Sequence, residues 1–159
     1  DTDTHLDTLK GWKAEGKIKY IGITHYTTSA FQELGKYIRS EQEIDFCQFP
    51  YSIEQRGAEN GFLQLCADYG VATLINMPFE QDGLFTGVLG EPLPDWTGDF
   101  GMDTWGQYFL KYLLADEAVT CLIPATGNPS HMTENLKAGL GPIPDQAEQK
   151  RMARYFDRL

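Results

Sequence analysis

The 159-residue sequence has few basic residues and no long hydrophobic run. Its 13 lysines and arginines stand against 23 aspartates and glutamates, which gives a net charge of -10. Because nucleic acids and anionic membrane surfaces repel such a protein, we expect neither as a partner and expect a small-molecule ligand. No apolar stretch approaches the roughly 18 residues of a membrane span, and no signal peptide opens the sequence, so we expect a cytoplasmic location.

Cysteine is also scarce. The three cysteines are Cys47, Cys66 and Cys121, and none belongs to a Cys-x-x-Cys or His-x-x-x-His pattern. A zinc site or a disulfide framework is therefore not predicted, and we expect reduced thiols that pack as small apolar groups. The sequence begins with Asp1 instead of Met, which we expect of a processed chain or of a piece of a longer protein.

Helical and strand patterns alternate along the chain. The predicted strands cover residues 17–24, 44–49, 71–76 and 119–123. The predicted helices cover residues 7–15, 58–69, 104–114 and 145–159. A further helix begins at a cap within residues 27–29 and runs to about residue 39, and another begins at residue 129. This order of one helix, four strand–helix units and a final helix predicts a parallel sheet with right-handed crossovers. No Gly-x-Gly-x-x-Gly motif follows any strand, which favours a (β/α) barrel over a doubly wound sheet, but four strands are only half of a barrel.

Residues 79–102 interrupt this alternation. The segment contains many glycines and prolines, interleaved with Leu84, Phe85, Trp96 and Phe100. A loop of this length is usually either disordered or functional. Solvated linkers seldom carry so many apolar groups, so the composition favours an ordered lid over a disordered segment.

Polar side chains follow each predicted strand, where parallel barrels carry their chemistry. Gln48 and Asn76 are the most informative, because an amide in an otherwise apolar strand needs hydrogen-bond partners that a ligand amide would supply. The alternative is a core amide that bonds to neighbouring backbone.

The last predicted strand leads into a helix start with the features of an anion site. Pro124 ends the strand, Asn128 suits a helix N-cap and Pro129 suits the first helical position. The amides of Ser130 and His131 are then expected to be free donors at the positive end of the helix dipole. The alternative is a capped helix without a ligand.

Four pieces of the sequence resemble, in order, the last four strands of an aldo/keto reductase. They are Gly16-Lys-Ile-Lys-Tyr-Ile-Gly-Ile-Thr24, Asp45-Phe-Cys-Gln-Phe-Pro-Tyr51, Gly70-Val-Ala-Thr-Leu-Ile-Asn-Met-Pro-Phe79, and Ile123-Pro-Ala-Thr followed by Glu134-Asn135. The resemblance implies a (β/α)8 barrel that reduces a small-molecule carbonyl compound with NADPH or NADH. Residues 1–159 would supply the last four βα units, strands five to eight, and the C-terminal helix.

The resemblance also implies cofactor-binding residues. Gln48 matches the side chain that holds the nicotinamide carboxamide, and Thr24 and His25 match the polar pair after the fifth strand that does the same. Asn76 falls where many members place a tyrosine that stacks on the nicotinamide, so contact is implied there and stacking is not. Six further residues match the segments that hold the adenosine end of the cofactor: Pro124, Ala125, Thr126, His131, Glu134 and Asn135.

Two departures from the family pattern concern the choice of cofactor. Ala125 stands where a lysine is common, and His131 stands where an arginine is common. Both weaken the grip on the 2′-phosphate of NADP, so the cofactor is expected to be NADP or NAD with only a slight preference for NADP.

The family's catalytic Asp, Tyr, Lys and His come from its first four strands, so no catalytic residue is assigned in this chain. Two hypotheses follow: the cofactor-binding half of a carbonyl reductase, or a non-enzymatic half-barrel binding or assembly protein. With two open sheet edges, an isolated chain is expected to pair with the missing N-terminal half or with a second copy of itself. Alone, it is expected to be an oligomer and inactive as a reductase.

Overall fold

The computed structural model describes residues 2–41 and 43–159 and contains one sheet of parallel strands in the order β1-β2-β3-β4. The strands are β1 (Gly22–Thr24), β2 (Phe46–Pro50), β3 (Ala72–Asn76) and β4 (Cys121–Leu122). The helices are α1 (Thr2–Ala14), α2 (Phe31–Ser40), α3 (Phe62–Asp68), α4 (Gly83–Gly87), α5 (Trp105–Leu114), α6 (Pro129–Lys137) and α7 (Gln146–Phe156). Three short 3-10 helices are η1 (Thr28–Ala30), η2 (Gly57–Glu59) and η3 (Asp95–Phe100). The predicted α/β class with a parallel sheet is confirmed.

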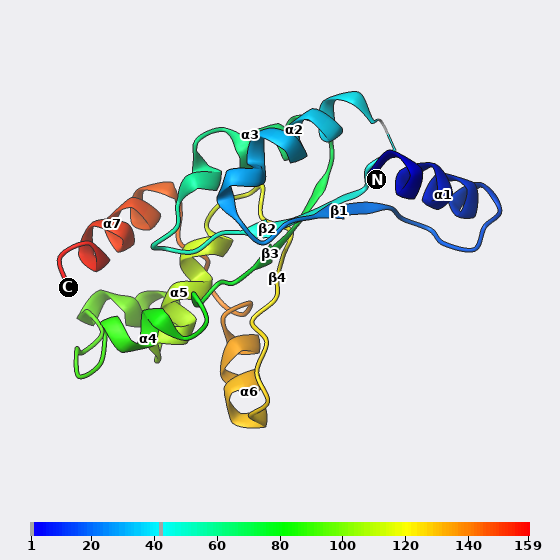
Figure 1. Ribbon diagram of the computed structural model, residues 1–159. Coiled ribbons are helices and arrows are strands. Elements are labelled where there is room, and N and C mark those ends of the chain that lie inside the picture. The colour runs from blue at the N-terminus through cyan, green and yellow to red at the C-terminus, as the bar shows by residue number, and fades with distance from the viewer. Residues whose placement is uncertain (1, 42) are drawn as a thin grey trace.

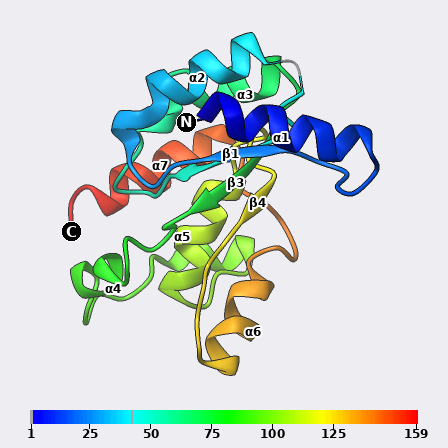
Figure 2. The same ribbon diagram turned by 45° about the vertical axis from the view of Figure 1, so that its right-hand side comes forward.

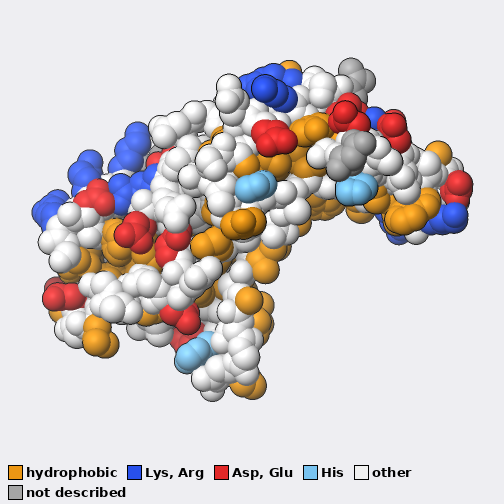
Figure 3. All heavy atoms as spheres, viewed as in Figure 1, with side chains coloured by type: hydrophobic (Ala, Val, Ile, Leu, Met, Phe, Trp, Pro, Cys, Tyr) orange, Lys and Arg blue, Asp and Glu red, His pale blue; other side chains and the backbone are white. Residues whose placement is uncertain are grey.

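The helices cover one side of the sheet. Helices α2 and α3 lie side by side above it, and α5 contacts both α6 and α7 (Figures 1 and 2). The space-filling view has the outline of an arch, hollow between α1 and α6, with apolar side chains along its inner side (Figure 3). None of the helices in the described ranges is both long and apolar enough to cross a membrane.

The core lies between the sheet and its helices. Cys47 and Phe49 of β2 and Ile75 of β3 are fully buried, because alternate residues of a strand point to the same face. Helix α2 contributes the buried side chains of Leu34 and Ile38. Burial of these groups provides the main favourable free energy of folding.

The two edge strands are shorter than predicted. Strand β1 begins at Gly22 instead of residue 17, because its partner β2 begins only at Phe46, opposite Gly22. Before that point the Asp45 carboxylate replaces a backbone partner and accepts the N–H of Ile21 at 2.7 Å. Strand β4 begins at Cys121 instead of residue 119.

Just before β4, threonine side chains replace the backbone hydrogen bonds that would pair this segment with β3. The N–H of Thr73 donates to Oγ1 of Thr120 at 3.1 Å, and the N–H of Thr120 donates to Oγ1 of Thr73 at 2.9 Å. The strand predicted over residues 44–49 ends one residue later than expected, at Pro50. The strand tolerates it because Tyr51 supplies the next bond to β3, through its N–H to the carbonyl of Asn76 at 3.4 Å.

The long segment 79–102 is packed through aromatic side chains. The ring of Trp96 lies 6.1 Å from that of Tyr108, and the guanidinium of Arg151 stacks over Trp96 at 4.2 Å. Such aromatic and cation–π contacts favour a fixed position for the segment around η3. The role of the segment as a lid stays a prediction.

A polar cluster ties α5 to its surroundings. The hydroxyls of Tyr51 and Tyr112 both donate to Oε1 of Glu59, the former at 2.8 Å. The fully buried Lys111 donates from Nζ to the carbonyls of Leu140 at 2.7 Å and Pro142 at 2.9 Å. These bonds hold the chain between α6 and α7 against α5.

Burial raises the pKa of Tyr51, Tyr108 and Tyr112 above the ordinary value of 10.0. The neutral hydroxyls therefore contribute stability that is fully present below about pH 10 and is lost as the pH rises further, because the unfolded chain ionises first. We predict that the free energy of unfolding falls as the pH rises above about 10.

Replacement Tyr112→Phe removes one of these ionising groups. It should lower the free energy of unfolding at neutral pH by about 1 to 3 kcal/mol through the lost hydrogen bond, and it should also reduce the alkaline slope. Urea unfolding at several pH values measures both effects, with the exposed Tyr69→Phe as the matched control. An alkaline slope identical in Tyr112→Phe and the parent protein would contradict this account.

Candidate functional site

The carboxyl ends of the first three strands bring four predicted site residues together. The sheet register places Thr24 opposite Gln48, and Pro50 opposite Asn76. The N–H of His25 donates to the carbonyl of Gln48 at 3.0 Å, and Nδ2 of Asn76 donates to the carbonyl of His25 at 3.2 Å. Thr24, His25, Gln48 and Asn76 therefore form one group, which we call the strand-end cluster.

The amide of Asn76 bonds to neighbouring backbone through its nitrogen and leaves its oxygen without a partner among the described residues. This oxygen, Oδ1, is buried. A buried acceptor without a partner costs about 1 to 3 kcal/mol. Gln48 is half-buried, and its amide makes no hydrogen bond to residues 2–41 or 43–159. The cluster thus offers unused amide groups at the strand ends.

The imidazole of His25 is held in one orientation. Its Nδ1 accepts the backbone N–H of Thr27 at 3.1 Å, so the neutral ring carries its proton on Nε2. The ring also stacks on Tyr26, with centroids 5.2 Å apart.

A second group surrounds a cavity of about 760 Å³ between the β3–α4 turn, the start of α5 and the β4–α6 loop. Its walls are formed by Phe79, Asp82, Phe85, Thr104, Trp105, Gly106, Ala125, Thr126, Gly127, His131, Glu134 and Asn135. Five of these are predicted site residues: Ala125, Thr126, His131, Glu134 and Asn135. Pro124 lies beside them, and its carbonyl accepts Nδ2 of Asn135 at 3.4 Å.

Sequence reasoning missed the side of the cavity formed by Phe79, Asp82, Thr104 and Trp105. Phe79 and Asp82 belong to the segment predicted as a lid, and their aromatic and acidic character was the available signal. Thr104 caps α5, with Oγ1 accepting the N–H of Gln107 at 3.3 Å. Thr104 also lines the cavity together with residues of α6, which the sequence does not indicate because only tertiary packing brings α5 and α6 together.

The start of α6 corrects one expectation. Oδ1 of Asn128 accepts the N–H of Ser130 at 2.9 Å, as an N-cap does. The Ser130 amide is therefore not free, because the cap that starts the helix uses it. The N–H of His131 has no hydrogen-bond acceptor in the described part of the chain and stays available to an anion.

The charges around the cavity are mostly negative. Asp82 and Glu134 contribute carboxylates, and no lysine or arginine is among the described residues of its wall. The Glu134 carboxylate accepts Nζ of Lys137 at 3.1 Å and Nε2 of Gln107 at 3.2 Å. A strongly anionic ligand group would meet repulsion at this wall.

The turn between β3 and α4 has an unusual backbone. Met77, Glu80, Gln81 and Asp82 all have positive φ values, between 50° and 72°, a region that non-glycine residues rarely adopt. Glu80 accepts Nε2 of Gln55 at 2.6 Å through one oxygen, and its other oxygen is buried without a partner among the described residues. Such backbone strain is common at ligand sites. The turn lies beside the cavity, because Phe79 and Asp82 form part of its wall.

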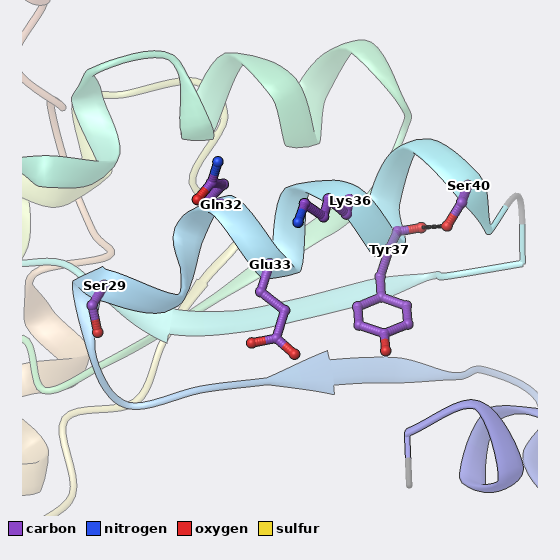
Figure 4. A pocket seen from close by; sticks show the side chains of 6 residues that line it. All are labelled: Ser29, Gln32, Glu33, Lys36, Tyr37 and Ser40. Atoms are coloured by element: carbon purple, nitrogen blue, oxygen red, sulfur yellow. Dashed lines mark hydrogen bonds between the residues drawn. The ribbon is translucent and has the colours of Figure 1, made fainter.

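The groove along α2 does not combine these features. The groove in Figure 4 is formed by Ser29, Gln32, Glu33, Lys36, Tyr37 and Ser40, spaced along α2 and the turn before it. Its only drawn hydrogen bond runs from the Ser40 hydroxyl to the Tyr37 carbonyl, within the helix. In residues 2–41 and 43–159 no group of three or more His, Cys, Asp or Glu side chains could hold a metal ion.

Two curated proteins from Escherichia coli (strain K12) are similar to this chain. A pyridoxine 4-dehydrogenase is 29% identical over 136 residues, which is 86% of this chain and 44% of that protein. An NADH-specific methylglyoxal reductase is 39% identical over 81 residues, which is 51% of this chain and 23% of that protein. The chain therefore spans less than half the length of these relatives.

Solved structures share the fold. A thermostable aldo-keto reductase in complex with the inhibitor epalrestat has a TM-score of 0.72 and 26% identity, covering 94% of this chain and 53% of that one. An aldo-keto reductase from Klebsiella pneumoniae in complex with NADPH has a TM-score of 0.73 and 20% identity, covering 95% and 52%. These matches confirm the predicted fold class, an α/β chain of the (β/α)8-barrel type.

The family model for the aldo/keto reductase family matches residues 1–151, nearly the whole sequence. By this match, this chain belongs to the aldo/keto reductase family.

Proposed function

We propose that this chain is the cofactor-binding part of an NAD(P)H-dependent reductase of small carbonyl compounds. The observation that carries the proposal is the unpartnered Oδ1 of Asn76, buried in the strand-end cluster at the edge where β2 and β3 end. A nicotinamide carboxamide is a donor–acceptor group that suits such a site. The cavity at the start of α6 supplies a second site for the rest of a dinucleotide.

The strand-end cluster would hold the nicotinamide end. The Gln48 amide offers both a donor and an acceptor, and Oδ1 of Asn76 offers an acceptor to a carboxamide N–H. His25, with Nδ1 occupied by Thr27, would present its Nε2 proton. When bound, the nicotinamide would supply the hydride, and these side chains would orient it.

The cavity would hold the adenosine end and its phosphates. Thr126 and the free N–H of His131 lie at the start of α6, where the helix dipole favours an anion. Ala125 offers no cation, and Glu134 and Asn135 match the residues that hold the ribose and the adenine in the family. As a lid over the substrate, segment 79–102 with Phe85, Trp96 and Phe100 would favour an apolar or aromatic carbonyl compound over a small charged one.

No proton donor for the alkoxide is assigned among the residues of this chain. Hydride transfer to a carbonyl needs such a donor, so we infer that this part alone binds a cofactor without reducing a substrate. The family's own catalytic groups would come from the N-terminal half of the protein.

A second candidate function rests on the sheet edges. Strands β1 and β4 each pair with only one neighbour in the described part of the chain. Such edges favour pairing with another segment, either the N-terminal half of the same protein or a second copy. A non-enzymatic half-barrel assembly protein would use these edges without using the cavity, so a nucleotide titration separates the two functions.

A negative charge at the phosphate position should prevent binding. We predict that Thr126→Glu weakens the binding of NADH by at least about tenfold, because a carboxylate there repels the pyrophosphate. Fluorescence titration of NADH into the protein that carries this chain measures the change. Thr133→Glu is the matched control, since Thr133 is exposed on the same helix outside the cavity. Equal affinity of Thr126→Glu and the parent protein would contradict the placement.

The choice of cofactor should depend weakly on the 2′-phosphate. A missing charge-assisted hydrogen bond removes about 1.5 to 3 kcal/mol of binding free energy, and Ala125 cannot make one. His131 stands where an arginine is common, so the permanent charge of a guanidinium is also missing. Titrating both reduced cofactors into the protein that carries this chain tests this prediction. A large preference for NADPH over NADH would contradict it.

A further inference from the structure

The last helix carries a concentration of positive charge in an otherwise acidic chain. Four of the 13 lysines and arginines lie in or just after α7, whereas residues 57–110 contain none. All four are exposed: Lys150, Arg151, Arg154 and Arg158. Lys and Arg side chains gather accordingly over α7, at the left of the space-filling view (Figures 1 and 3).

Three of these cations form a stripe along one side of the helix. Lys150, Arg154 and Arg158 recur at every fourth position, so they lie one above the other. The side chains of Lys150 and Arg154 have no partner among residues 2–41 and 43–159, and Arg158 donates only to the carbonyl of Arg154, at 3.0 Å. Like charges four residues apart destabilise a helix, and the helix dipole favours cations only in the last turn. The stability of α7 therefore does not account for the stripe.

The segment that packs against α7 carries the opposite charge. Residues 91–103 contain four carboxylates and no lysine or arginine. The guanidinium of Arg151 lies 4.2 Å from the ring of Trp96, which holds this segment beside the helix. All four carboxylates are exposed, and none has a side-chain partner in the described part of the chain: Glu91, Asp95, Asp99 and Asp103.

Aromatic side chains lie where the basic and acidic surfaces meet. The rings of Trp96 and Trp105 each lie 6.5 Å from the ring of Tyr155 in α7, and all three side chains are half-buried. The indole N–H of Trp105 donates to the carbonyl of Glu91 at 2.9 Å, which ties the acidic segment to these rings. Tryptophan, tyrosine and arginine are the residues enriched at the centres of protein interfaces. Residues 91–105 and α7 together form what we call the charged face.

We propose that the charged face binds a second copy of the protein about a two-fold axis, with the basic stripe of each copy against the acidic segment of the other. A two-fold contact uses the same patch on both copies, so the patch must complement itself. The charged face meets this condition, because both signs of charge lie side by side around an aromatic centre. The net charge of -10 disfavours nucleic acid or an anionic membrane as the occupant.

This contact goes beyond the proposed function. It leaves the edges of β1 and β4 free for another segment, and it uses none of the residues assigned to the strand-end cluster. Complementary charges speed the encounter of two proteins and fix their orientation, so association through the charged face should weaken as salt screens it.

Exchanging the charges of the two surfaces tests the proposal. One variant reverses the basic stripe through Lys150→Glu with Arg154→Glu, and a second reverses the acidic segment through Glu91→Lys with Asp95→Lys. Either variant alone would bring like charges together in both halves of a two-fold contact. An equimolar mixture of the two would place opposite charges together again in both halves.

The matched control is Lys19→Glu with Lys36→Glu. Both lysines are exposed outside the charged face, and their reversal changes the net charge as much as reversal of the basic stripe does. Thermal unfolding of each variant reports its fold, which should be kept because the reversed side chains are exposed and have no partner among the described residues.

Sedimentation velocity of the protein that carries this chain, over a range of concentrations, measures the dissociation constant of the dimer. We expect the parent protein and the control to form dimers, and each reversed variant to dimerise at least about tenfold more weakly. The mixture of the two reversed variants should recover the dimer. Raising the ionic strength from about 0.1 M to about 1 M shortens the screening length from about 10 Å to about 3 Å, so it should weaken the parent dimer.

Three results would overturn the proposal. The first is a parent protein that stays monomeric, and the second is a parent dimer that neither salt nor charge reversal weakens, as expected of pairing through the strand edges. The third is a mixture of folded reversed variants that does not recover the dimer. Titration with NADH tests the proposed function separately, and its failure would leave this inference standing.

Discussion

The parallel register of four strands determines where every candidate functional group lies. Thr24 faces Gln48 across one ladder, and Asn76 faces Pro50 across the next, so side chains far apart in the sequence meet at one edge of the sheet. The bond from Asn76 to the His25 carbonyl spans the end of β2 and ties that edge together. A shift of one residue in any strand would turn these groups to the opposite face.

The cavity beside this edge combines an attractive and a repulsive feature for an anion. The start of α6 offers a helix dipole and the free N–H of His131, while Asp82 before α4 and Glu134 further along α6 add carboxylates to the wall. The attraction is confined to the first helical turn, where a pyrophosphate would lie. The acidic wall then disfavours additional negative charge elsewhere on a bound ligand.

Sequence patterns predicted the helix starts that depend on interactions between neighbouring residues of the chain. The Asn128 cap with Pro129 at the first helical position lies where the sequence placed it, and the helix predicted over residues 104–114 is α5, Trp105–Leu114. Edge-strand lengths were overestimated, because they depend on where a neighbour begins and on threonine side chains that replace backbone bonds. The bond from Gln107 to Glu134 was not predictable, because it joins α5 to α6, which only tertiary packing brings together.

The central claim is that one dinucleotide occupies both the strand-end cluster and the cavity at α6. Hydrogen exchange of backbone amides, with and without NADH, tests it most directly on the protein that carries this chain. The account predicts slower exchange at residues 24–26 and 76–85, which include parts of the strand-end cluster, and at residues 124–131 of the cavity, with no change at residues 29–40, which form the groove of Figure 4. Unchanged exchange at residues 124–131, or protection confined to residues 29–40, would contradict it.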